Sequence, residues 1–329
     1  MEVSNLKLVC IGGGTGLSVM LRKLKDIFPD VTAVVTVADD GGGSGVLRND
    51  LKMLPPGDIR QCIIALSETE PFMKQLLMYR FNEGTLKGQS FGNLFLAAMN
   101  EISGGNFVDA VKRVSDVLRV KGKVLPVTEK DVCLNALMKN GKLICGESNI
   151  GHATHETKQK ISKVYLTATN EGEEISPLPE VIDAIENADL IVLGPGSLYT
   201  SVIPNLLVPR IVETIKNAKA KTVYINNIMT QPGETDGYSA YDHVKAILKH
   251  SCEGFIDYCI VNRGIADTEI LEKYIADGAE MVERDIERIK EKGIEVIETD
   301  LVGINDDGLI RHNSKALADA IKELTEKIG

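Results

Sequence analysis

The 329-residue sequence lacks the cysteine and histidine spacings that build zinc sites. Its six cysteines form no Cys-x-x-Cys pair, and no cysteine–histidine spacing fits a zinc ligand set. Cys10, Cys133 and Cys259 lie inside apolar, strand-like runs, so we predict that they are small buried residues. Unpaired, buried thiols are typical of a protein from a reducing compartment.

Positive charge is also scarce, because 37 lysines and arginines face 47 aspartates and glutamates, for a net charge of -10. An acidic chain without a basic run is a poor match for nucleic acid or for an anionic membrane. No apolar run approaches the roughly 20 residues needed to cross a bilayer, and the amino terminus has no leader pattern. We therefore expect a cytoplasmic protein with no membrane insertion and no nucleic-acid partner, and a homo-oligomer is compatible with this composition.

The standard nucleotide-binding and hydrolase motifs are missing as well. In the first glycine-rich loop, IGGGTG (11–16), the last glycine of a Gly-x-Gly-x-x-Gly pattern falls on Leu17 or on Val19. No Gly-x-x-x-x-Gly-Lys-[Ser/Thr] segment occurs, which argues against a P-loop NTPase. Neither a His-Glu-x-x-His pair nor a Gly-x-Ser-x-Gly elbow is present.

What the sequence does contain is an alternation of strand and helix patterns. An apolar run at 6–11 is followed by helical periodicity at 16–28 and by the β-branched run VTAVVTV at 31–37. Continuous apolar runs of this kind are typical of parallel strands that are buried on both faces. The same alternation resumes after about residue 178 and continues to the carboxyl terminus.

The intervening segment differs in character. Several helical patterns fill 58–118, and short strand candidates at 123–128, 133–138 and 143–148 follow, with Asn140-Gly141 as a hairpin turn. We therefore predict an α/β fold: one domain over 1–329 with a Rossmann-like, doubly wound, mainly parallel sheet. A helical and β-hairpin insertion is expected at about 58–170.

Glycine-rich loops follow two of the predicted strands. The first, IGGGTG, lies between a strand and a helix, where backbone N–H groups can bind a phosphate. The second, Gly194-Pro195-Gly196-Ser197, repeats this arrangement after the buried strand predicted from DLIVL. Glycines at these points let a ligand approach the backbone closely.

Polar side chains follow other strands. Asn226 and Asn227 end TVYINN, and their amides can bind a base or a sugar. Arg311 precedes a helix start that we predict to be capped by Ser314, and an arginine beside a helix amino terminus suits a phosphate. The alternative for Arg311 is a solvated surface position.

The stretch VADDGGGSG (37–45), followed by LPPGDIR, brings acidic residues to the same region. Asp39, Asp40 and Asp58 are hard oxygen ligands of the kind that Mg²⁺ prefers. The alternative is that Asp39 and Asp40 only brace the glycine loop through Asx-type hydrogen bonds. We predict a nucleotide site made of these loops, with the following members: Gly12, Gly13, Gly14, Thr15, Gly16, Asp39, Asp40, Gly194, Gly196, Ser197, Asn226, Asn227 and Arg311.

Several long segments resemble one family in order from about residue 8 to 262. IGGGTGLSVMLRKLK, VTVADDGGGSGVLR, SFGNLFLAAMNEISG, LGPGSLYTSVIPNLLV and MTQPGETDGY are similar to the gluconeogenesis factor family. This YvcK-like family (UPF0052) is a branch of the superfamily that also contains 2-phospho-L-lactate transferase (CofD-like). The resemblance implies a Rossmann-like core, a cytoplasmic bacterial protein, a role in growth on gluconeogenic carbon sources and in cell shape, and binding of UDP-sugars such as UDP-N-acetylglucosamine.

Three functions remain open at this point. The first is a nucleotide-sugar-binding regulator without catalysis, which has no catalytic residue. The second is a Mg²⁺-dependent transferase of phosphorus-containing groups, in which Asp39, Asp40 and Asp58 hold the metal and Asp58 positions an acceptor hydroxyl. The third is an NAD-type dinucleotide binder in which Asp39 binds a ribose hydroxyl, and the failed Gly-x-Gly-x-x-Gly pattern weighs against it.

Overall fold

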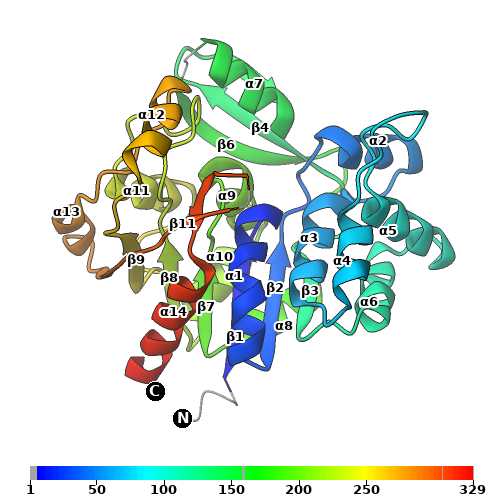
Figure 1. The fold of residues 1–329 in the computed structure, drawn as a ribbon, viewed down its shortest axis with the longest axis horizontal. Coiled ribbons are helices and arrows are strands. Elements are labelled where there is room, and N and C mark those ends of the chain that lie inside the picture. The colour runs from blue at the N-terminus through cyan, green and yellow to red at the C-terminus, as the bar shows by residue number, and fades with distance from the viewer. Residues whose placement is uncertain (1–5, 158–159, 306, 329) are drawn as a thin grey trace.

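The computed structural model describes residues 6–157, 160–305 and 307–328. Its centre is a seven-stranded sheet (Figure 1). In spatial order the strands are β10 (Glu295–Thr299), β9 (Tyr258–Asn262), β8 (Lys221–Ile225), β7 (Leu190–Leu193), β1 (Lys7–Gly12), β2 (Asp30–Val35) and β3 (Lys123–Pro126). Every neighbouring pair is parallel, which confirms the predicted α/β, Rossmann-like fold.

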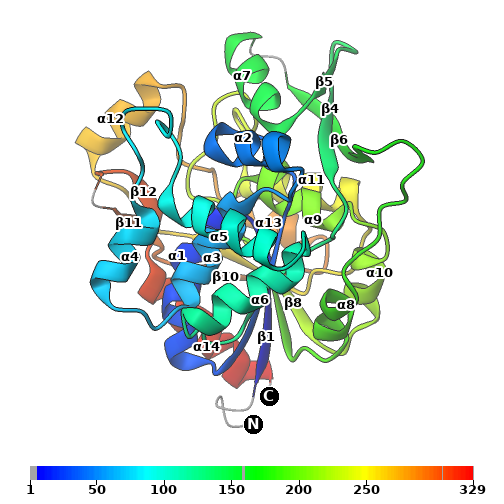
Figure 2. The ribbon, with the colours of Figure 1, turned by 90° about the vertical axis from the view of Figure 1, so that its right-hand side faces the viewer.

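Helices cover both faces of this sheet, as its continuous apolar strands require. Figure 2 shows α1 (Gly14–Ile27) and α14 (Ser314–Ile328) on one side of β1, with α8 (Pro179–Glu186) and α10 (Ile211–Asn217) on the other. The other helices that follow β7 in the chain are α9 (Ile203–Leu206), α11 (Ala240–His250), α12 (Thr268–Ala276) and α13 (Ile286–Lys290). A π-helical turn, η2, lies at Leu198–Val202.

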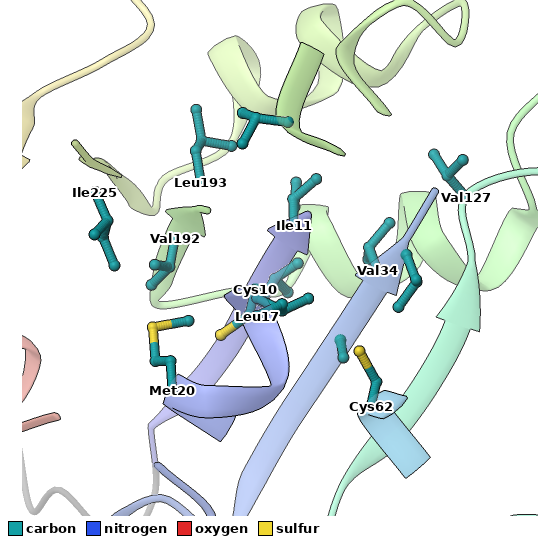
Figure 3. Packing of buried hydrophobic residues seen from close by; sticks show 14 of the residues in the cluster. Cys10, Ile11, Leu17, Met20, Val34, Cys62, Val127, Val192, Leu193 and Ile225 are labelled. Carbon is teal, nitrogen blue, oxygen red and sulfur yellow. The ribbon is translucent and has the colours of Figure 1, made fainter. Parts of the chain in front are cut away.

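The core forms where α1 packs on the sheet. Leu17 and Met20 are one helical turn apart on the inner face of α1, and both are fully buried. In Figure 3 they lie beside Cys10 of β1 and near Val192 of β7. This contact anchors α1, so the loop that precedes it is held against the strand ends.

Strand order reverses between β1 and β7. The chain runs outward from β1 through β2 to β3 in one direction, and from β7 through β8 and β9 to β10 in the other. Ligands of open α/β sheets bind in the crevice at such a switch point, outside the carboxyl ends of the strands. Ile11 pairs with Leu193 in this register, so the two glycine-rich loops that follow these strands are neighbours.

The segment between β2 and α8, which contains the insertion predicted at about 58–170, forms a set of helices and a small sheet in addition to β3. Its helices are α2 (Gly42–Leu51), α3 (Pro56–Leu66), α4 (Pro71–Met78), α5 (Phe91–Ile102), α6 (Phe107–Val117) and α7 (Glu147–Thr157). Its antiparallel sheet has the order β5 (Leu143–Cys145), β4 (Val132–Met138) and β6 (Ile161–Ala168). Gly141 has φ 85° in the turn between β4 and β5, which confirms the predicted hairpin.

Two details of the insertion differ from the prediction. Residues 123–126 are not part of the small sheet: they form β3, because Val124 and Leu125 are buried beside β2 in the central sheet. Cys133 is only half-buried, since its side chain lies on the uncovered face of β4, with its Sγ 2.7 Å from that of Cys145. Cys10 and Cys259 are buried as predicted.

Among the residues that the structure describes, no helix combines the length and the apolar character that crossing a membrane requires. The remaining strands, β11 (Val302–Ile304) and β12 (Ile310–His312), form a separate antiparallel hairpin before α14.

Candidate functional site

The two glycine-rich loops touch each other at the switch point. A Cβ atom on Gly16 would lie 2.5 Å from the Pro195 carbonyl oxygen and 2.9 Å from Gly196 Cα. Only glycine permits this approach, because the Cβ atom of any other residue would overlap these backbone atoms. The contact brings the amino terminus of α1 beside the loop that follows β7.

Beside this contact lies a cavity of about 660 Å³, which we call the switch-point cavity. Six of the predicted site residues line it, and they come from both loops, from the end of β8 and from β12. They are Thr15, Gly16, Gly196, Ser197, Asn227 and Arg311. The structure therefore brings together residues that are separated by almost 300 positions in the chain.

Amide side chains hold the wall of the cavity in place. Asn227 Nδ2 donates to the Gly196 carbonyl oxygen at 3.0 Å, and Gln231 Nε2 donates to Ser197 Oγ at 2.9 Å. The Gln231 Oε1 atom is buried without a hydrogen-bond partner in the described part of the chain. Asn227 thus positions the second glycine loop, whereas Gln231 has an acceptor left over for a ligand.

Asn226 has a different environment from its neighbour. It is fully buried, and its Nδ2 donates to the Ala240 carbonyl oxygen at 3.0 Å, so it does not line the switch-point cavity. Its own carbonyl oxygen accepts from His312 Nε2 at 3.0 Å. Because burial lowers the pKa of His312 to about 4, this imidazole is neutral and links β8 to β12.

Arg311 lies on β12 at the edge of the cavity. Its Nη1 donates to the Ile310 carbonyl oxygen at 2.8 Å, and it forms no ion pair with a described residue. The prediction that Ser314 caps the next helix is wrong: Asn313 Oδ1 accepts from the backbone N–H groups of Lys315 and Ala316. Ser314 is instead the first helical residue, because Asn313 is one position better placed to reach these donors.

Asp58 occupies the opposite side of the first glycine loop. The Gly14 backbone N–H is hydrogen-bonded to its carboxylate, and a Cβ atom on Gly13 would lie 2.9 Å from Asp58 Oδ2. Desolvation is the main effect on the Asp58 pKa, which rises to about 6 although the Gly14 hydrogen bond opposes the shift. Asp58 therefore satisfies part of the helix amino terminus at which we predicted a phosphate.

Gly12, Gly13 and Gly194 make their contacts within the protein itself. The Gly12 carbonyl oxygen accepts from Asn205 Nδ2 and from Thr36 N, each at 3.0 Å. A Cβ atom on Gly13 would also lie 2.6 Å from Ser201 Oγ. Gly194 donates its N–H to the Ile11 carbonyl oxygen at 2.8 Å. These residues shape the loops but do not line the switch-point cavity.

Asp39 and Asp40 take part in separate hydrogen bonds. Asp39 Oδ1 accepts from the Gly41 N–H at 2.9 Å, which is an Asx-type bond. Asp40 Oδ1 accepts from Ser148 N at 2.9 Å and from Ser148 Oγ at 2.7 Å, and so ties this loop to α7. Asp39 therefore braces the glycine loop, while Asp40 joins it to the insertion.

A second cavity, of about 190 Å³, adjoins Asp39 and Asp58. Its lining includes Arg60, Arg80 and Asn93 in addition to the two aspartates, and we call it the arginine pocket. Asp40 does not line it. Within the described ranges, no group of three or more histidine, cysteine, aspartate or glutamate side chains is arranged to hold a metal ion, and the proposed Mg²⁺ site stays a prediction.

The half-buried Glu147, which lies near Asp39 and Asp58, and the buried Glu234 had no motif to identify them. Glu147 begins α7 and Glu234 lies in the loop after β8, and each has one carboxylate oxygen without a partner among the described residues. Desolvation raises the Glu234 pKa to about 7, and desolvation together with nearby carboxylates raises that of Glu147 well above its usual value. The unusual length and polarity of the loop after β8 indicated a role for that segment, whereas nothing local marks Glu147.

Comparison with known proteins agrees with this architecture. The family model described as 2-phospho-L-lactate transferase CofD matches residues 8–302. A protein from Thermoanaerobacterium thermosulfurigenes is 54% identical over 320 residues, which cover 97% of each chain. The gluconeogenesis factor of Bacillus subtilis (strain 168) is 51% identical over 322 residues, 98% of each chain.

A solved structure is similar over the same extent. The crystal structure of a UPF0052-family protein from Bacillus halodurans superimposes with a TM-score of 0.90 at 45% sequence identity, and covers 96% of this chain and 99% of that one. The chain therefore belongs to the gluconeogenesis factor (UPF0052) family within the CofD superfamily.

Proposed function

We propose that the switch-point cavity binds a nucleoside diphosphate sugar, such as UDP-N-acetylglucosamine, and that the protein acts as a cytoplasmic regulator through this binding. The observation that carries the proposal is the convergence of two glycine loops and Arg311, which has no ion pair among the described residues, on a single cavity at the reversal of strand order. Such crevices are the usual ligand sites of open α/β sheets.

The size and chemistry of the cavity suit this ligand class. Its volume of about 660 Å³ falls within the range of small-molecule sites. The α1 amino terminus and the Arg311 guanidinium favour a diphosphate. Gln231 Oε1 and the Asp277 carboxylate, which also lines the cavity, supply acceptors for hydroxyl or amide groups of a nucleoside and a sugar.

The names of the relatives indicate the biological role. Proteins that match this chain over nearly its whole length are named gluconeogenesis factor. We infer that ligand binding couples growth on gluconeogenic carbon sources to the supply of cell-wall precursors, and hence to cell shape. A regulator of this kind needs a selective site but no catalytic group.

Asp58 supports a second candidate function, a Mg²⁺-dependent transferase of phosphorus-containing groups. The Asp58 carboxylate contacts the first glycine loop and also lines the arginine pocket, and its pKa of about 6 suits a group that exchanges a proton near neutral pH. The family model described as 2-phospho-L-lactate transferase is consistent with this chemistry. Asp39 and Asp58 would be the metal ligands, and Mg²⁺ would neutralise the phosphate charge.

Calorimetric titration distinguishes these functions. UDP-N-acetylglucosamine, UDP-glucose, GDP and NAD are each titrated with and without Mg²⁺. The regulator predicts tight binding of UDP-sugars that does not need the metal, whereas the transferase predicts binding that Mg²⁺ strengthens. Failure of every nucleotide to bind would contradict both, and preference for NAD would favour a dinucleotide binder.

Arg311→Ala tests the site itself. Loss of a charge-assisted hydrogen bond to phosphate should weaken UDP-sugar binding by roughly tenfold or more. Arg22→Ala is the matched control, because Arg22 is an exposed arginine on α1 away from the cavity lining. Equal affinities of the two variants would remove Arg311 from the site.

A further inference from the structure

Arg60 is a buried guanidinium without a carboxylate partner. Its side chain is 8% exposed, and Nη1 donates to Ser90 Oγ at 2.7 Å. Nε is buried with no hydrogen-bond partner, and Arg60 forms no ion pair among the residues described. Asp58 is near enough to act on the Arg60 charge, but a buried guanidinium that forms no ion pair is costly, so its retention points to an anion that would pair with it.

A glycine of α5, Gly92, leaves the space that the Arg60 side chain occupies. A Cβ atom on Gly92 would lie 2.6 Å from Arg60 Cδ and 2.5 Å from the Leu77 carbonyl oxygen, so α5 admits the Arg60 side chain only because residue 92 is glycine. Burial, and next the nearby charge of Arg80, lower the Arg60 pKa, but a guanidinium keeps its charge at neutral pH.

Arg80 and the start of α2 form the rest of the positive wall. Arg80 is exposed, lines the same pocket, and donates from Nη1 to the Gly88 carbonyl oxygen. Helix α2 begins after Gly41 without a side-chain cap. Its backbone N–H groups at Gly42, Gly43 and Ser44 donate no hydrogen bond to any residue in the described ranges, which leaves the positive end of the helix facing the pocket lining.

The two aspartates of the pocket neutralise these arginines only in part: Asp58 raises the Arg60 pKa, but by less than burial and Arg80 lower it. Neither Asp39 nor Asp58 forms an ion pair with Arg60 or Arg80; their carboxylates bond instead to the N–H groups of Gly41 and Gly14. Asn93, which is 3% exposed, adds an amide whose Oδ1 is buried without a partner in the described chain. The acidic and basic groups therefore both line the pocket without forming an ion pair.

We propose that the arginine pocket is a binding site for the phosphoryl group of a second small ligand, separate from the switch-point cavity. The planar guanidinium groups of Arg60 and Arg80 and the free N–H groups of α2 would bind its oxygens, as arginine pairs and helix amino termini do for phosphate. A volume of about 190 Å³ admits a small phosphorylated head but not a nucleotide. This site does not depend on nucleotide binding in the other cavity.

Inorganic phosphate is the probe, titrated into the full-length protein at low ionic strength and followed by calorimetry. Wild type and the Arg22→Ala control should bind phosphate alike. Arg80→Ala, an exposed change that spares the core, should weaken phosphate binding by about tenfold. Arg60→Lys keeps the charge but loses the planar donor set, and should weaken it as well, with folding verified by circular dichroism.

Two further titrations make the outcome decisive. Phosphate affinity should be unchanged when UDP-N-acetylglucosamine is saturating; competition would assign the arginines to the nucleotide site and overturn the proposal. Acetate should bind more weakly than phosphate; equal binding would indicate a carboxylate site instead. The proposal is also overturned if Arg80→Ala binds phosphate as tightly as wild type, or if wild type binds no phosphate. A protein that binds phosphate but no nucleotide would contradict only the function proposed for the switch-point cavity.

Discussion

The switch-point cavity and the arginine pocket lie on opposite sides of the first glycine loop, and they differ in chemistry. The first is lined mainly by backbone, hydroxyl, amide and apolar groups, with Arg311 and Asp277 as its charged residues. The second is small and carries two arginines and two aspartates. The first cavity therefore offers a mostly uncharged, selective surface and the second a charged one, which suits a nucleoside diphosphate sugar and a phosphoryl group respectively.

The first cavity depends on backbone geometry, and the second depends on side chains from the insertion. This difference decides how each one responds to mutation. Changes at the glycine contact should abolish binding in the switch-point cavity, whereas changes of charge should act mainly on the arginine pocket.

Gly16→Val should have the largest effect. Its side chain would collide with the Pro195 carbonyl oxygen and with Gly196 Cα, so the two loops must separate. We expect loss of UDP-sugar binding in calorimetry and a destabilisation of about 1–3 kcal/mol in chemical denaturation.

Gly12→Ala is the comparison for that variant, because a Cβ atom on Gly12 has its nearest neighbours at 3.8 Å. It should fold with little loss of stability. If Gly16→Val binds UDP-sugar as wild type does, the contact between the two loops does not shape the site.

Asp58→Asn should have an intermediate effect, because Asp58 lines the arginine pocket and is hydrogen-bonded to the glycine loop that leads to the switch-point cavity. Its folded pKa of about 6 lies above the ordinary aspartate value of 3.8, so the folded state binds the proton more tightly than the unfolded state. Wild-type stability should therefore fall as pH rises from about 4 to about 6, and Asp58→Asn should remove this part of the slope. Thermal unfolding from pH 4 to 8 measures it.

The same substitution separates the two functions. In a binding regulator, Asp58→Asn removes a negative charge beside the diphosphate and should raise UDP-sugar affinity at pH 7.5 by a few-fold. In a Mg²⁺-dependent transferase it should abolish the metal's contribution to binding. A wild-type stability that does not change between pH 4 and pH 6 would contradict the assigned environment of Asp58.

Asp40→Ala should have the smallest effect, because Asp40 lines neither cavity. It loses the two hydrogen bonds to Ser148, and we expect a destabilisation of about 1–2 kcal/mol with unchanged nucleotide and phosphate affinity. Denaturation and calorimetry on one preparation measure both quantities. A large loss of Mg²⁺-dependent binding in this variant would instead identify Asp40 as a metal ligand.

The sequence predicts the fold well, because apolar runs and glycines determine where strands and turns form within their own short segments. VTAVVTV forms β2 and its extension, and the glycine loops lie at strand ends as expected. The edge strand β3 was harder to place, since a four-residue strand beside helices has no periodicity that separates it from a hairpin.

The site is predicted only in part, for a physical reason. Thr15, Gly16 and Ser197 meet because strand order brings their loops together, and Arg311 joins them from the separate β11–β12 hairpin. Arg60 and Arg80 reach the arginine pocket through the packing of α3 and the segment after α4 against α5, and sequence spacing does not reveal such contacts. Asn226 and Asn227 show the same limit: adjacent residues at a strand end point into different environments, one into the core and one to the cavity wall.

A crystal structure of the complex with UDP-N-acetylglucosamine tests the central claim most directly. The predicted result is a diphosphate against Thr15, Gly16 and Ser197 with Arg311 in contact, and an arginine pocket that the nucleotide does not enter. A diphosphate bound by Arg60 and Arg80, with the switch-point cavity empty, would contradict the assignment of the two cavities.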